Sequence, residues 1–382
     1  MEPKDLGLKI KNYRISKGLT QQEFADLLFI APQTVSKWER GMSYPDIFKL
    51  KEICRVLCVS VGEFLGESVV YENGDYLIAV DGGGTKTEFV LFKPSGEIVS
   101  KIVLGSSNPN SSGIENSINI LKEGTERLLS SGKTPKRIFM GVSGTLLGNN
   151  KEIITAALKR QYPAYKINVE SDIMNVIGMV RDPSKCIATI IGTGSVVYGW
   201  DGEKLKRVGG WGYLFGDVGS GYDIGREVIR AAYSYADGLT AKSEVVRLAE
   251  IKLGGSAPDH TDSIYRAGKD YIASFAPLAF EAMASGDETA RAIIQSNADS
   301  IAALINHMHN YGYYGNHVVI SGGLAQHSSE MTALIGEKLN KNIVAEFPSA
   351  PPIFGAMRMC TIKERCAIDF DTFEKNFKNS YN

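Results

Sequence analysis

The sequence predicts two unlike parts, a small all-α domain at the N-terminus and a larger α/β domain after it. Residues 5–66 show only helical patterns, separated by short turns. From residue 76 onward, short apolar runs alternate with amphipathic stretches, as in chains whose strands alternate with helices. Two strand–turn–strand units with glycine turns, at 76–92 and 186–200, indicate two similar halves in the larger part. The predicted division is residues 1–68, a polar linker at 69–75, and two lobes at 76–190 and 191–382.

The composition is that of an ordinary globular protein and excludes several classes. Hydrophobic residues make up 43% of the 382 residues and charged residues 22%. The chain has no apolar run of about 18 or more residues and no apolar signal-peptide core near its first residue, so we expect neither a membrane span nor export. The five cysteines include no CxxC pair, which favours reduced thiols in a cytoplasmic protein.

Capping signals delimit the helices of the first part. Gly18 is expected to end a first helix, and Thr20 with Glu23 three residues later forms a capping-box pattern at the start of a second. Pro32 suits the first turn of a third helix, which is expected to end at Gly41. This segment carries seven Lys and three Arg against five Glu and three Asp up to residue 66. The small positive excess points only weakly to a nucleic-acid partner.

The segment LTQQEFADLLFIAPQTVSKWERGMSYPD, residues 19–46, resembles the helix-turn-helix of phage-repressor-like proteins. The resemblance implies that the third helix reads the major groove of double-stranded DNA, in a dimer on a palindromic site. The contacts that it implies are Gln33, Thr34, Ser36 and Lys37 on the third helix, and Gln22 at the start of the second. Phe29 and Ala31 depart from the family, whose turn usually carries Gly and a Ser or Thr. The alternative is a helical bundle that only dimerises the protein.

Residues 76–92, YLIAVDGGGTKTEFVLF, predict a strand, a tight glycine turn and an antiparallel strand. Glycines let several backbone N–H groups approach one ligand, which is how loops hold phosphate. Asp81 stands at the end of the first strand, where a carboxylate can hold a divalent cation against phosphates. The alternative is a hairpin with a flexible tip.

Alternating elements follow and lead to two further glycine turns. The expected order is a strand at 98–104, a polar loop at 105–113, a helix at 114–129, a strand at 137–142, a helix near 151–161 and a strand at 165–170 that delivers Asp172. This alternation predicts a largely parallel sheet, in which ligands gather at the carboxyl ends of the strands. The second glycine turn lies within CIATIIGTGSVVYGW, residues 186–200, and the third within VVISGGLA, residues 318–325.

The motifs DGGGTKT, SSNPN, ESD, IIGTGSVVYGW, GGWGYLFGDVGSGYDIG and ISGGLA occur in that order between residues 76 and 366. In this order they resemble the sugar kinase, actin and heat-shock chaperone superfamily, and within it the N-acetylglucosamine kinase branch of BadF/BadG-type ATPases. The resemblance implies a two-lobed, ribonuclease-H-like (actin-like) ATPase fold. It also implies transfer of the γ-phosphate of ATP, with Mg²⁺, to a hydroxyl of an amino sugar.

The resemblance assigns roles to individual residues. Asp81 would hold Mg²⁺ through water, and Asp172 would be the general base for the sugar hydroxyl. The implied ATP contacts are Gly83, Gly84, Thr85, Lys86, Thr193 and Gly194 at the phosphates, with Gly322 and Gly323 on the adenine side. The implied sugar contacts are Asn108, Ser195, Gly210, Trp211, Gly212 and Asp217.

Each role has a plainer alternative. Asp172 would serve equally as the cap of the helix that follows it, and Asp217 could order its own glycine-rich loop. Pro109 and Val196 stand where the resemblance leads us to expect polar sugar contacts, so N-acetylmuramic acid, glucosamine, N-acetylmannosamine or another hexose stay open. The alternative to a kinase with a DNA-binding head is a catalytically silent transcription regulator that senses sugar or nucleotide.

Overall fold

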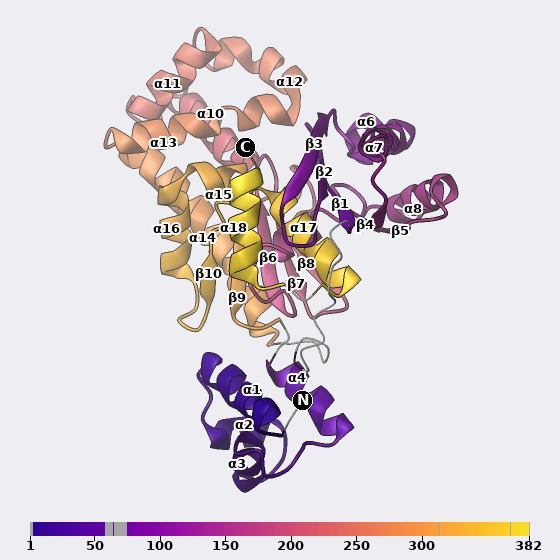
Figure 1. The fold of residues 1–382 in the computed structure, drawn as a ribbon. Helices are drawn as coiled ribbons and strands as arrows, with labels where there is room; N and C mark the ends of the chain where they lie inside the picture. Colours follow the sequence, from indigo (N-terminus) through magenta and orange to yellow (C-terminus); the bar gives the residue numbers. More distant parts are fainter. Residues whose placement is uncertain (1–2, 58–63, 65–74, 313, 367, 382) are drawn as a thin grey trace.

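The computed structural model describes residues 3–57, 64, 75–312, 314–366 and 368–381 (Figure 1). The predicted linker therefore lies, apart from Asp75, outside the described residues. In the first part the helices are α1 (Pro3–Ser16), α2 (Gln21–Leu27), α3 (Pro32–Glu39) and α4 (Ile47–Leu57). Their inward faces form one apolar core, which includes Ile10, Phe24, Leu28, Val35, Trp38, Ile53, Leu57 and Phe64.

Local signals set the helix boundaries of this part as the sequence predicts. The Glu23 N–H donates to Thr20 Oγ1, and the Thr20 N–H donates to the Glu23 carboxylate at 2.7 Å, which confirms the capping box. Pro32 begins α3. Phe29, at the turn between α2 and α3, has a φ of +54° in the left-handed region and is 93% exposed. A residue other than glycine at this position therefore carries a steric cost.

The second part contains two five-stranded sheets, with strand orders β3-β2-β1-β4-β5 and β10-β9-β6-β7-β8. The first consists of β1 (Tyr76–Gly82), β2 (Thr87–Phe92), β3 (Ile98–Leu104), β4 (Pro135–Val142) and β5 (Lys166–Glu170). The second consists of β6 (Cys186–Ile191), β7 (Ser195–Trp200), β8 (Leu205–Val208), β9 (His317–Ser321) and β10 (Val344–Glu346). The predicted boundary between the two lobes, at residues 190 and 191, falls inside β6.

The expectation of a largely parallel sheet is wrong. In each sheet the first three strands pair antiparallel, and the remaining strands pair parallel. The reason is that β1–β3 and β6–β8 are joined by short turns, which permit only antiparallel neighbours, while the later strands return through helices. The carboxyl ends of β1, β4 and β5 nevertheless lie along one edge, as the parallel pairs require.

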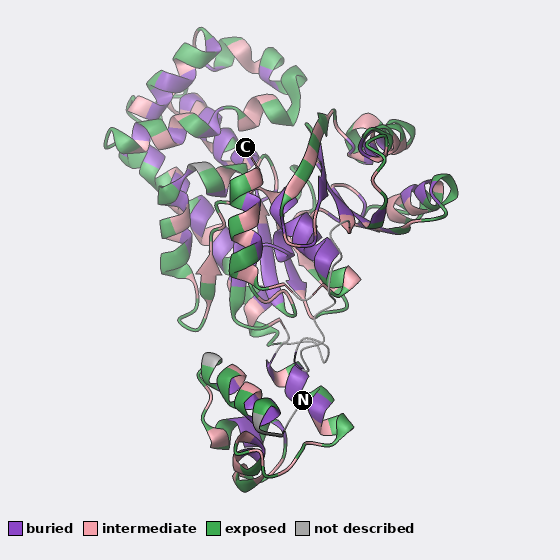
Figure 2. Ribbon diagram, viewed as in Figure 1, coloured by how far each residue is buried: buried purple, intermediate pink, exposed green. Residues whose placement is uncertain are grey.

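Helices pack around both sheets, and buried residues, most of them apolar, lie along the strands and on parts of these helices (Figure 2). Those of the first sheet are α6 (Pro109–Ser112), α7 (Ile114–Leu129) and α8 (Asn150–Gln161). On the second sheet, α14 (Glu288–Asn310) and α15 (Gly323–His327) pack on the strands, and α16 (Ser329–Lys338) packs on α14. The helices α10 (Gly221–Ala236), α11 (Glu244–Leu253), α12 (Thr261–Ala273) and α13 (Ala276–Ala284) pack on one another and, through α10 and α13, on α14, with a 3₁₀ turn at Pro258–His260. No helix among the described residues is long and apolar enough to cross a membrane.

A layer of helices joins the two sheets. In it, α17 (Pro352–Glu364) packs on β1 and β4 and crosses α9 (Ile173–Ile177), which also packs on β6. The crossing is close, because a Cβ at Gly355 would overlap the carbonyl oxygen of Asn175. The last helix, α18 (Phe370–Ser380), buries Phe373 and Phe377 in the same core. The carboxyl end of the described chain thus returns to the first sheet, next to β3.

Candidate active site

The first glycine turn joins β1 to β2 and is fixed by the loops beside it. The Gly83 N–H donates to the Lys86 carbonyl oxygen at 2.9 Å, which closes the turn. The Ser143 N–H, beyond β4, donates to the Gly82 carbonyl oxygen at 2.8 Å, and the Ser107 N–H donates to that of Gly83 at 3.3 Å. Gly84, Thr85 and Lys86 are exposed at the tip. The turn therefore presents its backbone at the same edge as the carboxyl ends of β1 and β4.

Asp81 lies below this turn and is fixed by a buried amide. Asn175 Nδ2 donates to Asp81 Oδ1 at 2.7 Å, and Asn175 is fully buried on α9. Only glycine fits at position 141, because a Cβ there would overlap Asn175 Oδ1. Burial raises the pKa of Asp81 to about 7; the Asn175 hydrogen bond opposes this shift, while the charges of Asp172 and Glu88 add to it.

Asp172 stands at the end of β5 and accepts several hydrogen bonds. The Ile173 N–H donates to Asp172 Oδ1 at 3.0 Å, so the carboxylate caps α9, and Ser171 Oγ donates to it at 2.9 Å. Burial raises the pKa of Asp172, and hydrogen bonds from Ser171 and Ser143 act against that rise. Asn108 Nδ2 in turn donates to Ser143 Oγ at 3.4 Å. The structure thus links Asn108, Ser143 and Asp172 in one polar chain.

The second glycine turn, between β6 and β7, is held by the start of α10. The Gly192 N–H donates to the Gly194 carbonyl oxygen at 2.8 Å. At the first turn of α10, the Gly221 N–H donates to the Gly192 carbonyl at 2.8 Å and the Tyr222 N–H to the Thr193 carbonyl at 3.1 Å. Gly322 packs against the end of β6, since its φ is +108° and a Cβ there would lie 2.5 Å from the Ile191 carbonyl oxygen. Gly323 follows it as the first residue of α15.

The side chains expected at the sugar mostly bind their own loops. Asp217 has a left-handed φ of +55° and accepts the backbone N–H groups of Gly212 and Ser195, while burial raises its pKa. Ser195 Oγ donates to the Val218 carbonyl oxygen at 2.6 Å. Asp217 therefore orders the loop that contains Gly210, Trp211 and Gly212, in agreement with its plainer alternative.

Trp211 is 64% exposed, with the guanidinium carbon of Arg207 only 3.8 Å from its ring centroid. Arg207 also hydrogen-bonds Tyr198, whose pKa is raised by burial. A cation–π contact of this kind holds the indole in place at an exposed site. Trp211 is therefore positioned by β8 and available to a ligand, rather than part of the core.

The predicted residues gather in two groups, one at each sheet. The first comprises Asp81, Gly83, Gly84, Thr85, Lys86, Asn108 and Asp172, and the second comprises Thr193, Gly194, Ser195, Gly210, Trp211, Gly212, Asp217, Gly322 and Gly323. The sequence reading missed Ser143, Asn175, Glu88 and Arg207. Two had a signal: Asn175 follows Asp172 by three residues on a helix, and Glu88 pairs with Asp81 in the hairpin register.

The donors around Asp81 fit a divalent cation such as Mg²⁺. Carboxylate and amide oxygens are the ligands that this ion prefers. Asn175 Oδ1 and Glu88 Oε1 are buried acceptors without a hydrogen-bond partner. Within the described ranges, no three His, Cys, Asp or Glu side chains are arranged to hold a metal by themselves. Water or phosphate oxygens would therefore complete the coordination shell.

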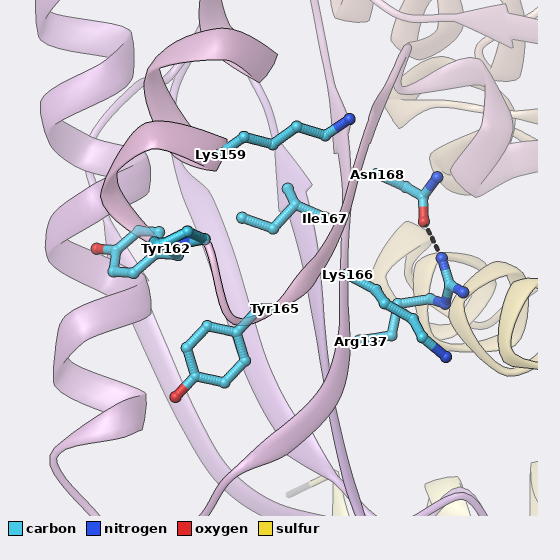
Figure 3. A pocket seen from close by; sticks show the side chains of 8 residues that line it. Arg137, Lys159, Tyr162, Tyr165, Lys166, Ile167 and Asn168 are labelled. Carbon is cyan, nitrogen blue, oxygen red and sulfur yellow. Dashed lines mark hydrogen bonds between the residues drawn. The ribbon is translucent and has the colours of Figure 1, made fainter.

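Two open hollows lie away from these residues. One, of about 340 Å³, is at the amino ends of β4 and β5; in Figure 3, Lys159 and Tyr162 line one side of it, and Arg137 donates to Asn168 on the other. The second, of about 350 Å³, lies between α10 and α14. Neither is lined by a predicted site residue.

The residues expected to contact DNA are accessible to different degrees. Gln33 and Lys37 are exposed on α3, whereas Thr34 and Ser36 are half-buried. Gln22 is exposed on α2, with its Nε2 donating to Asp26 Oδ1 at 2.8 Å.

Comparisons with known proteins agree with this division. A model of the BadF/BadG/BcrA/BcrD ATPase family matches residues 78–357, and a helix-turn-helix model matches residues 10–64. An N-acetylmuramic acid/N-acetylglucosamine kinase of Clostridium acetobutylicum is 32% identical over 234 residues, which cover 58% of this chain and 76% of that protein. An N-acetyl-D-glucosamine kinase of Dictyostelium discoideum is 26% identical over 299 residues, covering 72% and 92%.

A solved structure shares the fold. It comes from Chromobacterium violaceum and is provisionally assigned as an N-acetylglucosamine kinase. The superposition has a TM-score of 0.59 at 23% identity and covers 75% of this chain and 99% of that one. The second part of the chain thus has the fold of that protein.

Proposed function

The chain belongs to the BadF/BadG/BcrA/BcrD ATPase family, and on this premise we propose that it is an ATP-dependent amino-sugar kinase with a DNA-binding N-terminal domain. The observation that carries the proposal is the pair of half-buried carboxylates, Asp81 and Asp172, at the carboxyl ends of β1 and β5 beside a glycine turn. Phosphoryl transfer needs mainly positioned phosphates, a cation and one base, and this edge offers residues for each.

Asp172 is the general base of the proposed reaction. Its carboxylate takes the proton of the sugar hydroxyl, whose oxygen bonds to the γ-phosphorus while the bond from that phosphorus to the ADP oxygen breaks. The raised pKa of Asp172 favours this role, because a base works best when its pKa approaches the working pH. Ser143 and Asn108 orient the carboxylate and line the side from which the sugar would approach.

Asp81 holds the cation in this proposal, and Asn175 fixes its carboxylate. When bound, Mg²⁺ supplies positive charge against the phosphates. The Gly83 N–H closes the first turn, so the backbone N–H groups of Gly84, Thr85 and Lys86 there, and of Thr193 and Gly194 in the second turn, bind phosphate oxygens, while Gly322 and Gly323 face the adenine side. The proposal includes a two-lobed, ribonuclease-H-like ATPase fold. It also includes the division of the chain into a DNA-binding domain at 1–68, a linker at 69–75 and two lobes at 76–190 and 191–382.

The amino-sugar class rests on the two curated relatives, whose names specify N-acetylglucosamine or N-acetylmuramic acid. Exposed Trp211 would pack on the apolar face of the sugar. We further propose a cytoplasmic homodimer, because one helix-turn-helix buries too little surface to bind DNA tightly and dimers read palindromic half-sites.

The kinase is tested with purified protein, Mg-ATP and a panel of amino sugars, by following ADP release. Asp172→Asn is the decisive variant, because asparagine caps a helix as well as aspartate does but cannot act as the base. Asp369→Asn is its control, since Asp369 caps α18 by accepting the Thr372 N–H, a bond that asparagine also keeps. We expect turnover with one sugar, lost only in Asp172→Asn. If no sugar is phosphorylated but one raises the melting temperature, the protein is the catalytically silent sensor.

DNA binding is tested by selecting duplexes from a random-sequence library with the full-length protein. Enrichment of a palindromic site, and its loss in a Gln33→Ala/Lys37→Ala variant, are the expected results. A library that shows no enrichment would leave the N-terminal domain as a dimerising bundle.

A further inference from the structure

Glu88 is a buried carboxylate that the proposed mechanism does not use. It is 4% exposed and lies directly opposite Asp81 in the hairpin, so both side chains point to the same face of the sheet. Its Oε1 has no hydrogen-bond partner. Like charges directly opposite each other on neighbouring strands repel, and a buried charge without a partner is costly. A divalent cation between the two carboxylates would compensate both charges.

The other oxygen of Glu88 is held by the last helix. Tyr381 Oη donates to Glu88 Oε2 at 3.3 Å. Lys101 fixes the tyrosine through two contacts. Its Nζ donates to the Tyr381 carbonyl oxygen at 2.9 Å and lies 4.2 Å from the centroid of the Tyr381 ring. Beside it, the Ile98 N–H donates to Ser380 Oγ at 2.9 Å, which ties the end of α18 to β3. These contacts place the hydroxyl against Glu88 while Oε1 stays unpaired.

We propose that Glu88 is a second carboxylate of the divalent-cation site, beside Asp81, and that Tyr381 is its positioning residue. The inference rests on the proposed function for the identity of the cation, Mg²⁺ in the presence of ATP. Its geometric basis is separate: two carboxylates on one face, one of them with an unpaired buried oxygen. The proposal makes α18, the last helix of the described chain, a component of the cation site.

The described chain offers a matched control pair. Tyr162 Oη, at the end of α8, approaches Glu126 Oε1 of α7 at 3.2 Å, so it repeats the tyrosine–glutamate contact far from the glycine turns. Glu126→Gln and Tyr162→Phe remove the same chemical groups as Glu88→Gln and Tyr381→Phe. They report what loss of such a contact does to stability alone.

The experiment measures the affinity of the full chain for Mn²⁺, with and without ADP, by electron paramagnetic resonance of free Mn²⁺. We expect Glu88→Gln to weaken binding about tenfold or more, and Tyr381→Phe to weaken it about tenfold, as loss of a ligand's hydrogen-bond partner does. Glu88→Asp should recover part of the affinity. Neither variant of the control pair should change it.

The outcomes separate this inference from the proposed function. Affinity of Glu88→Gln within about twofold of the wild type, with binding lost in Asp81→Asn, would overturn the role of Glu88 alone. Unchanged affinity in both variants would remove Asp81 as well and contradict the proposed cation site. A wild-type chain that binds Mn²⁺ neither alone nor with ADP would overturn the inference too.

Discussion

Asp81→Asn should stabilise the metal-free protein, although it removes a residue proposed to hold the cation. Asparagine has nearly the same shape and keeps an oxygen that can accept the Asn175 amide, so the hydrogen bond at 2.7 Å is retained. What the substitution removes is a buried negative charge beside Asp172 and Glu88. Functional sites commonly hold such unfavourable groups, and removing them raises stability at the expense of activity.

The magnitude follows from the pKa of Asp81, about 7 in the folded chain against 3.8 for an unperturbed aspartate. Because the folded state holds the proton more tightly, raising the pH from about 4 to about 7 ionises the unfolded state first and lowers the free energy of unfolding. At about 1.36 kcal/mol for each pKa unit, the difference amounts to at most about 4 kcal/mol above pH 7. Asp81 keeps some contact with solvent, so we expect about 2–4 kcal/mol.

The assay is urea unfolding in EDTA at pH 8.5 and at pH 4.5, in a Trp38→Phe background, where the fluorescence comes from Trp200 and Trp211 of the α/β part. The gain in Asp81→Asn should be large at the higher pH and shrink to under about 1 kcal/mol at the lower one. Adding Mg²⁺ should stabilise the wild type but not the variant. A gain that is absent, or equal at both pH values, would refute the assignment of the charge to Asp81.

Three further predictions concern positions that the structure makes sensitive. Gly141→Ala should lower the free energy of unfolding by about 1–3 kcal/mol and weaken Mn²⁺ binding, because the added Cβ displaces the Asn175 side chain. Unchanged affinity for Mn²⁺ would show that the Asn175 amide does not fix the cation site. Phe29→Gly should stabilise the N-terminal domain by up to about 1 kcal/mol in urea unfolding, since it relieves a left-handed φ of +54°, and a loss would mean that the exposed ring makes contacts. Arg14→Ala should lower the free energy of unfolding of the N-terminal domain by about 3–5 kcal/mol, because it removes the guanidinium from the buried Glu39 carboxylate; the Arg14→Met/Glu39→Met pair should lower it less, in urea unfolding followed by the fluorescence of Trp38.

Elements that depend on neighbours in the chain were predictable from the sequence. The helix at 114–129 and the strand at 98–104 have the predicted limits, and the capping box at Thr20 forms as expected. Their signals are apolar periodicity, glycines and capping residues within a few positions of one another. The mixed sheets were missed because a strand's partner depends on how the chain returns, which local patterns do not contain.

The candidate site divides in the same way. The glycine turns and the ends of β1 and β5 were predictable, because the residues of each motif are adjacent in the sequence and determine the local backbone conformation. The amide of Asn175 was not, since its partner Asp81 is 94 residues away in the sequence and is reached only when α9 packs between the sheets. The contact of Tyr381 with Glu88 spans 293 residues and depends on the return of α18.

Asp172 shows why a capping role and a catalytic role need not exclude each other. The Ile173 N–H donates to Asp172 Oδ1 and fixes the carboxylate at the start of α9, where the same helix carries Asn175 toward Asp81. A general base needs a fixed carboxylate that can still accept a proton, and a carboxylate has about four acceptor sites, so the capping bond to Oδ1 uses only one of them. The capping bond therefore orients the proposed base. This is why Asp172→Asn, which keeps the cap, separates the two roles and an alanine substitution does not.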